Sequence, residues 1–167
     1  SGTLHPPSMF ADLLGLEGAV CREYPSPFPP ENRMVLAWGG LSSRFRLRDD
    51  ALYRTAAARL ATICAATPGN VAAFFTSYDF LERVRSFLDI PSRKLVVERR
   101  GFGKNERDAV VETLFRSADN LLLATLSGSF YEGVDFRDNA LSTVVVVGLP
   151  LPPPSPENRA YQEHVGK

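Results

Sequence analysis

The segment 127–138 carries the residue types with the most chemistry in this 167-residue chain. It combines hydroxyls, glycines and carboxylates: Ser127, Gly128, Ser129, Glu132, Gly133, Asp135 and Asp138. Glu132 and Asp135 have no His or metal-ligand partner nearby, so we expect no catalysis from this loop alone. Two interpretations stay open. The residues either only turn the chain, or form a coupling loop in which Gly133 lets the backbone approach a ligand.

A second polar turn, Thr76-Ser77-Tyr78, follows the apolar run Val71–Phe75. The plain interpretation is a strand-to-helix turn in which Ser77 caps the helix. The functional interpretation is an anion site, because hydroxyls and free N–H groups at a helix N-terminus bind phosphate. Tyr78 would then be available to stack on a base.

Basic residues gather in two places. Arg44, Arg46 and Arg48 alternate, so in an extended segment they share one face. The pattern indicates either a solvated edge strand or a stripe that contacts phosphates. The second set surrounds a glycine-rich turn and is interpreted as a surface cluster balanced by nearby carboxylates such as Glu98. Its members are Arg93, Lys94, Arg99, Arg100, Lys104 and Arg107.

Apolar periodicity predicts the elements that must position these residues. Strands are expected at 33–38, 71–75, 94–98, 121–126 and 143–147. Helices are expected at 8–14, 51–66, 78–88, 105–118 and 157–165. From residue 71 onward strands and helices alternate, which predicts an α/β fold with a mostly parallel sheet and helices on both faces.

The loops after the carboxyl ends of parallel strands carry the ligand site in such sheets. We therefore expect the turn at 76–78 and the loop from 127 to emerge side by side from one rim of the sheet. Placement on opposite edges, or antiparallel pairing of the runs 71–75 and 121–126, would contradict a functional interpretation of the two turns.

Composition bounds the class of protein. Hydrophobic residues make up 44% and charged residues 23%, which is typical of a soluble globular domain. The net charge is zero, so any site for a polyanion must be local. Cys21 and Cys64 lack metal-ligand spacing, so we expect no metal or iron–sulfur site here, and Cys64 is interpreted as a core residue. With no run of 18 apolar residues and no signal peptide, we expect an intracellular protein without a membrane partner.

Several strings in order resemble the XPD/Rad3/DinG-type DNA helicases of superfamily 2. S-F-Y-E-G-V-D-F (129–136) resembles motif V, F-F-T-S-Y (74–78) resembles motif IV, and S-G-T-L (1–4) resembles motif III. P-F-P-P-E-N-R (27–33) is similar to the connector in these proteins, and S-S-R-F-x-x-R-D (42–49) also resembles the family. The resemblance covers nearly the whole chain.

This resemblance implies a RecA-like (P-loop NTPase-type) fold and a piece of a larger protein. Residues 1–32 would end the first motor domain and form a linker with a short helix, and residues 33–167 would be most of the second motor domain. DNA-binding residues implied by the resemblance are Thr76, Ser77, Tyr78, Ser127, Ser129 and, as a weaker assignment, Arg44. Residues implied to couple DNA to the ATP cleft are Glu132, Gly133 and Asp135. No catalytic residue and no metal ligand is assigned within the chain.

The sequence holds no G-x-x-x-x-G-K-[ST] phosphate loop, no acid pair for Mg²⁺ and no Q-x-x-G-R-x-x-R element. By resemblance, ATP and Mg²⁺ would bind mainly to the missing first motor domain. Any iron–sulfur cluster would lie there too, and the arginine element would follow residue 167. The isolated chain is therefore expected neither to hydrolyse ATP nor to unwind DNA.

The resemblance implies an ATP-dependent helicase that moves 5′ to 3′ on single-stranded DNA, partnered by its own first motor domain. Such a protein would be cytoplasmic and nucleoid-associated in a prokaryote, or nuclear in a eukaryote, with DNA repair as one setting. Two alternatives stay open: another superfamily 2 motor, such as an RNA helicase or translocase, and a non-motor α/β binding module.

Overall fold

The computed structural model describes residues 4–42, 45–149 and 155–165. The chain divides into two units, one of residues Ser1–Ala37 with Pro152–Lys167 and one of Trp38–Leu151. In the first unit, α1 spans Pro7–Leu13, a 3₁₀ turn spans Pro30–Asn32 and α5 spans Pro156–Val165. The division into 1–32 and 33–167 stays a prediction.

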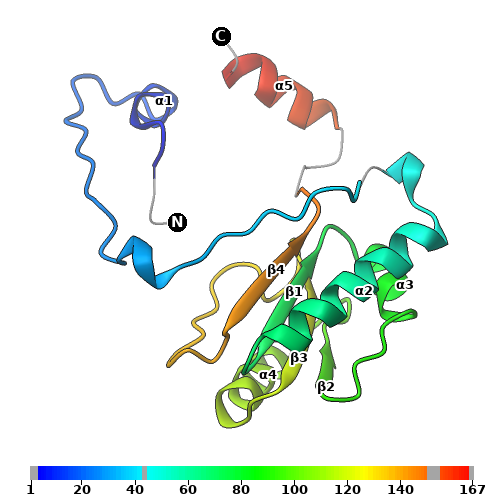
Figure 1. The fold of residues 1–167 in the computed structure, drawn as a ribbon. Coiled ribbons are helices and arrows are strands. Elements are labelled where there is room, and N and C mark those ends of the chain that lie inside the picture. The colour runs from blue at the N-terminus through cyan, green and yellow to red at the C-terminus, as the bar shows by residue number, and fades with distance from the viewer. Residues whose placement is uncertain (1–3, 43–44, 150–154, 166–167) are drawn as a thin grey trace. The chain divides into compact units, whose positions relative to one another are not determined.

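The second unit is built on a parallel sheet (Figure 1). Its strands lie in the order β2-β3-β1-β4, and all three pairs are parallel. The strands are β1 (Val71–Phe75), β2 (Lys94–Val97), β3 (Asn120–Thr125) and β4 (Thr143–Val147), and the helices are α2 (Asp50–Ala66), α3 (Tyr78–Arg85) and α4 (Lys104–Arg116). β1 and β3 are buried along their whole length, as expected of central strands in a sheet covered on both faces.

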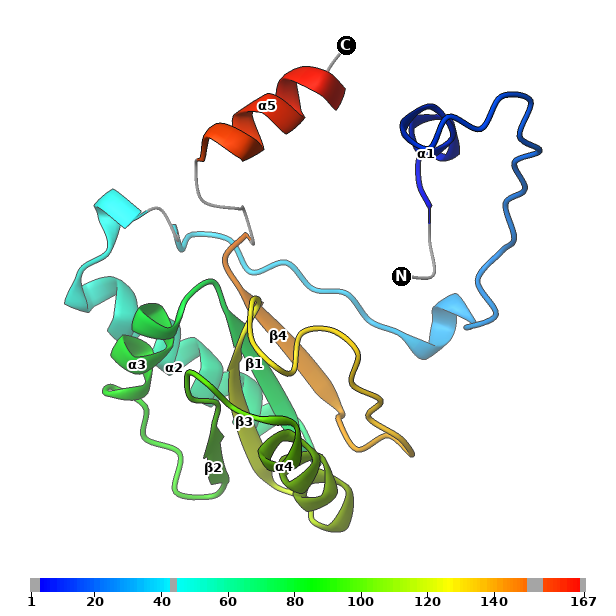
Figure 2. The ribbon, with the colours of Figure 1, turned by 180° about the vertical axis from the view of Figure 1, so that it is seen from behind.

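Alternate residues of the central strands face two separate cores. Val71, Ala73 and Phe75 of β1 pack with the buried residues of α2 and α3, whereas Ala72 and Phe74 pack with Leu114 of α4. Figures 1 and 2, seen from opposite sides, show α2 and α4 on opposite faces. The predicted α/β fold with helices on both faces is confirmed.

Local sequence signals explain where the helices begin. Asp49 caps α2 by accepting the N–H of Leu52 at 2.8 Å, and Ser77 caps α3 by accepting the N–H of Phe80 at 3.2 Å. These caps satisfy backbone donors that have no partner inside the helix. The 78–88 helix was predicted three residues too long, because α3 ends at Arg85.

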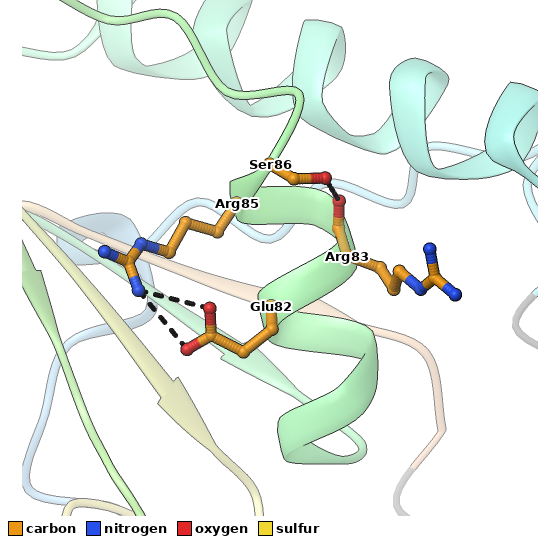
Figure 3. Close-up of polar contacts among 4 residues, drawn as sticks. All are labelled: Glu82, Arg83, Arg85 and Ser86. Carbon is orange, nitrogen blue, oxygen red and sulfur yellow. Dashed lines mark hydrogen bonds and ion pairs between the residues drawn. The ribbon is translucent and has the colours of Figure 1, made fainter.

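Exposed polar contacts surround the end of α3 (Figure 3). The Ser86 hydroxyl donates to the carbonyl of Arg83 at 2.7 Å. The chain then tightens into turns in which Phe87 N–H reaches Val84 O, which explains the early end. Glu82 and Arg85 form an exposed ion pair at 3.1 Å.

The predicted strand at 33–38 is wrong. No strand is formed there, and Met34, Val35 and Leu36 are exposed. An apolar run becomes a strand only when its backbone groups pair with a neighbour. No such pairing involves these residues within the described parts of the chain.

Buried polar side chains hold together the amino edge of the sheet, that is, the end at which its parallel strands begin. Asn70, just before β1, donates to the carbonyls of Leu114, Ser117 and Ala140 at 2.7–2.9 Å. Its side-chain oxygen accepts both the backbone and the side-chain N–H of Asn120. The end of α4 and the end of the loop before β4 are thereby tied to β1 and β3.

Arg93 ties the end of α2 to the amino edge of the sheet. Its guanidinium donates to the carbonyls of Cys64, Thr67, Gly69 and Asn120. Burial raises the pKa of the Cys64 thiol, and the nearby Arg93 charge opposes this shift to a smaller extent. Cys64 is buried, as the sequence predicted.

Candidate nucleic-acid interface

The two predicted turns leave the sheet side by side. Phe75 and Thr125 are the last residues of β1 and β3 and lie in register in a parallel pair. The Leu126 N–H, just past β3, donates to Phe75 O at 2.8 Å. The prediction of a shared rim is therefore confirmed, and this carboxyl edge is where parallel sheets bind ligands.

The turn after β1 lies close to two guanidinium groups. Thr76 accepts a hydrogen bond from Arg48 Nη2 at 3.3 Å, and the Arg100 guanidinium lies 4.9 Å from the centre of the Tyr78 ring. These two guanidinium groups and the positive end of the α3 dipole bring positive charge to the turn, whereas Asp79 in the first turn of α3 carries a negative charge beside it. Basic groups thus gather at this turn in a chain whose net charge is zero.

The two guanidinium groups come from different parts of the unit. Arg48 precedes α2 and also lies over the Phe80 ring at 4.6 Å. Arg100 belongs to the loop between β2 and α4 and is exposed. A guanidinium within about 6 Å of the centre of an aromatic ring is attracted to the ring face, which helps to hold both arginines in place.

The loop after β3 is held by a carboxylate from the neighbouring strand. Glu98 follows β2 and is 1% exposed. Its Oε2 accepts the N–H of Thr125 at 2.8 Å, and its Oε1 accepts the N–H of Ser129. The Thr125 hydroxyl lies 3.4 Å from the same Oε2. Glu98 thus bridges the end of β3 and the first turn of the loop.

Gly128 is required by the space that Glu98 fills. A Cβ on Gly128 would lie 2.5 Å from the Glu98 carboxyl carbon and closer still to both oxygens. The Ser129 hydroxyl donates to Phe102 O at 3.0 Å, and the rings of Phe102 and Phe130 lie 5.9 Å apart. The β2–α4 loop and the loop after β3 therefore pack as one piece.

The three residues predicted to couple DNA to the ATP cleft lie further along the same loop, on the α4 side of the sheet (Figure 2). They are Glu132, Gly133 and Asp135. Gly133 and Asp135 line a hollow of about 460 Å³ with residues of α4, whereas Glu132 is exposed and does not line it. Gly133 has φ +71°, a conformation that glycine adopts readily. Asp135 pairs with Arg137 at 3.3 Å, both exposed.

The structure thus brings some predicted residues together and separates others. Thr76, Ser77, Tyr78, Ser127 and Ser129 gather at the carboxyl edge of adjacent strands. Within the described residues, no hydrogen bond or ion pair joins the coupling set (Glu132, Gly133, Asp135) to the turn at 76–78. Arg44 lies outside the described residues. The roles of these residues stay predictions.

The contacts of three residues at the carboxyl edge were not predicted from the sequence. Glu98 was read as a surface carboxylate, and this was wrong because it is buried. A carboxylate directly after an apolar strand was the available signal. Arg100 was grouped with a surface cluster, and Gly128 was read only as a turn residue. The partner that explains each of them lies far away in the sequence.

In the part of the chain that the structure describes, no three His, Cys, Asp or Glu side chains cluster as metal ligands would. No helix of that part has the length and apolar character needed to cross a membrane.

Comparisons with known proteins give a consistent result. The family described as "Helicase C-terminal domain" matches residues 60–167. The chain is 30% identical over 184 residues to the "ATP-dependent DNA helicase chl1" of Aspergillus fumigatus, covering 90% of this chain and 23% of that protein. It is 32% identical over 121 residues to the "ATP-dependent DNA helicase XPD" of Sulfolobus acidocaldarius, covering 68% of this chain and 20% of that protein.

Solved structures agree with the sequence matches. A structure named "XPD_Helicase" superposes with a TM-score of 0.61 at 26% identity, covering 75% of this chain and 22% of that one. Another, "XPD_APO", gives a TM-score of 0.59 at 25% identity, covering 75% of this chain and 25% of that one. The RecA-like fold that the family resemblance implied is confirmed by these likenesses.

Proposed function

Because the chain belongs to the family of helicase C-terminal domains and is of the XPD/Rad3 type, we propose that it is the second motor domain of an ATP-dependent DNA helicase. The chain spans about a fifth of the length of the curated relatives it matches. The activity is therefore proposed for the whole protein, with this chain as the half that grips the nucleic-acid strand. Its place would be with DNA inside the cell.

The observation that carries the proposal is the parallel pairing of β1 and β3. It brings the hydroxyls at 76–77 and the exposed Ser127 to one edge, beside the Arg48 and Arg100 guanidinium groups. Hydroxyls, N–H groups and guanidinium groups are the donors that bind phosphate oxygens. An aromatic ring at the same edge supports stacking on a base of a single strand. We infer that this edge binds the backbone of single-stranded DNA.

ATP and Mg²⁺ do not fit this chain by itself. The sequence lacks a phosphate loop, and the described residues hold no group of acidic side chains that fits a metal ion. We propose that both bind mainly to the first motor domain of the same protein. Glu132, Gly133 and Asp135 are then the candidates for coupling between the DNA edge and that cleft.

Single-stranded DNA binding tests the proposal directly. We expect a labelled oligo(dT) to bind the purified chain, measured by fluorescence anisotropy, with an affinity that falls steeply as salt rises. Changing Ser77 and Tyr78 together to Ala should weaken binding about fivefold or more, since stacking on one base contributes about 1–3 kcal/mol. No binding at low salt, or unchanged binding by the double variant, would contradict the proposal.

The nature of the strand is tested in the same assay. An oligo(rU) of equal length should bind more weakly than oligo(dT) if the protein is a DNA helicase. Equal or tighter RNA binding would favour an RNA motor of the same superfamily instead.

Activity needs the whole protein. We expect no DNA-stimulated phosphate release from this chain alone, and release from the full-length protein. The proposed polarity is tested with duplexes that carry either a 5′ or a 3′ single-stranded tail. Unwinding of the 3′-tailed duplex only would contradict movement from 5′ to 3′.

A further inference from the structure

The buried carboxylate of Glu98 is not used by the proposed function. It lies at the carboxyl edge and is almost fully buried, at 1% exposure. A carboxylate in such a place is stable only when its oxygens accept hydrogen bonds. Its partners are two backbone N–H groups of the adjacent strand and loop, together with the Thr125 hydroxyl.

The two oxygens of Glu98 hold both ends of one tight turn. Thr125 donates to Oε2 from the last position of β3, and Ser129 donates to Oε1. Between them, the Gly128 N–H donates to Thr125 O at 3.1 Å and closes the turn. A side chain on Gly128 would collide with the carboxylate, so glycine and glutamate fit each other at this point.

Ser127 lies at the outer point of this turn and is exposed. Among the described residues, neither its hydroxyl nor its N–H is engaged in a hydrogen bond. The neighbouring Ser129 differs, because its hydroxyl and its N–H are already bound to Phe102 O and to Glu98. Ser127 is thus the residue of this turn whose donors are available to a ligand.

We propose that Glu98 is a positioning residue, a buried carboxylate that fixes the turn 125–129 and so directs the donors of Ser127 toward a phosphate of the bound strand. The inference rests on the proposed function, because it assumes that this edge binds single-stranded DNA. It adds a residue that follows β2 to a site otherwise formed by the loops after β1 and β3.

A double-mutant cycle tests this role with E98Q, S127A and the two combined. Glutamine keeps the size of the side chain, but its NH₂ group would face a backbone N–H and cannot accept it. We expect E98Q and S127A each to weaken oligo(dT) binding roughly tenfold, and the combined variant to lose clearly less than the product of the two separate losses. Such non-additivity is expected when one residue acts through the other.

The matched control is E82Q. Glu82 lies on α3 in an exposed ion pair with Arg85 (Figure 3), and its change removes the same charge without touching the turn. We expect E82Q to change affinity less than twofold. If Glu98 had only a structural role, E98Q would lower the melting temperature. The affinity losses of E98Q and S127A would then multiply in the combined variant.

The possible outcomes distinguish failure of the proposed function from failure of the proposed role of Glu98. If the unaltered chain does not bind oligo(dT), both the proposed function and the role of Glu98 are contradicted. If it binds, but E98Q binds normally or the two losses multiply, only the role of Glu98 is overturned.

A measurement on the unaltered chain covers the case in which E98Q does not fold. By NMR we expect slow hydrogen exchange at the amides of Thr125 and Ser129, and a shift of the Ser127 amide on adding oligo(dT). Fast exchange at both amides, or a Ser127 amide that does not respond to DNA, would overturn the proposal.

Discussion

The two edges of the sheet use their polar residues in opposite ways. At the amino edge, Asn70, Asn120 and Arg93 direct their side chains at the protein's own carbonyls and are at least half-buried. At the carboxyl edge, Thr76, Ser127 and Arg100 are partly or fully exposed. The first edge therefore holds the unit together, and the second is open to a ligand.

Because of this difference, mutations should be able to separate stability from binding. Changes at the amino edge should lower the free energy of unfolding and leave the DNA affinity of the folded chain unchanged. Changes at the carboxyl edge should do the reverse, except where a residue such as Ser77 serves both purposes. Four substitutions test this contrast, and their effects should decrease in the order Asn70→Ala, Arg93→Lys, Ser77→Asp and Arg100→Gln.

Asn70→Ala should be the most destabilising change. It leaves the carbonyls of Leu114, Ser117 and Ala140, of which the first and last are buried, without this donor, at a cost of about 3 kcal/mol or more. Urea unfolding followed by circular dichroism measures the loss. Asn105→Ala, at an exposed position of α4, is the control and should change stability by less than about 0.5 kcal/mol. Equal effects of the two changes would contradict a structural role for the amino edge.

Arg93→Lys should destabilise by about 2 kcal/mol, because an ammonium group cannot replace the fork of donors that reaches several carbonyls at once. Differential scanning calorimetry would record the lower melting temperature. The corresponding change Arg85→Lys affects only an exposed ion pair and should shift the melting temperature little. If Arg93→Lys were as stable as the unaltered chain, the hydrogen bonds of Arg93 would contribute little.

Ser77→Asp should separate helix capping from phosphate binding. Aspartate caps helices as well as serine does, so the unfolding free energy should stay within about 0.5 kcal/mol of its original value. A negative charge facing the strand should nevertheless weaken oligo(dT) binding about tenfold. Ser77→Ala, which loses the cap, should lower stability by about 1 kcal/mol. Normal DNA binding by Ser77→Asp would remove Ser77 from the interface.

Arg100→Gln should have the smallest effect. Loss of one phosphate contact lowers the slope of log K against log salt by about 0.7 for a single strand. The matched change is Arg99→Gln, because the Arg99 guanidinium is already paired with Glu106 at 3.2 Å. Titrations of oligo(dT) at several salt concentrations give both slopes. Equal changes of slope would show that the two arginines act only through general charge.

Local patterns predicted the fold and the two turns. The apolar runs at 71–75 and 121–126 correspond to β1 and β3, with β3 beginning one residue earlier than expected, and Ser77 was predicted as a cap from its position before a helical pattern. These signals depend on neighbours within a few residues. The apolar run at 33–38 shows the limit, because a strand also needs a partner that sequence periodicity does not reveal.

The residues that hold the two edges could not be predicted in this way. Asn70 reaches carbonyls 44, 47 and 70 residues further along the chain, and Glu98 binds N–H groups 27 and 31 residues away. A polar residue looks the same in the sequence whether it is solvated or buried with partners. Only the folded arrangement of β2, β3 and α4 distinguishes the two cases.

The loop between β3 and β4 is fastened at both of its ends. Glu98 binds its start, while Asn70 binds Ala140 O with its side chain and accepts the Ser142 N–H with its carbonyl. Its middle, near Gly133, lies at the surface. Changes of length should consequently be tolerated better in this exposed middle part than at either fastened end. A Gly-Ser insertion after Gly133 should leave the melting temperature nearly unchanged, whereas the same insertion after Ser127 should lower it clearly.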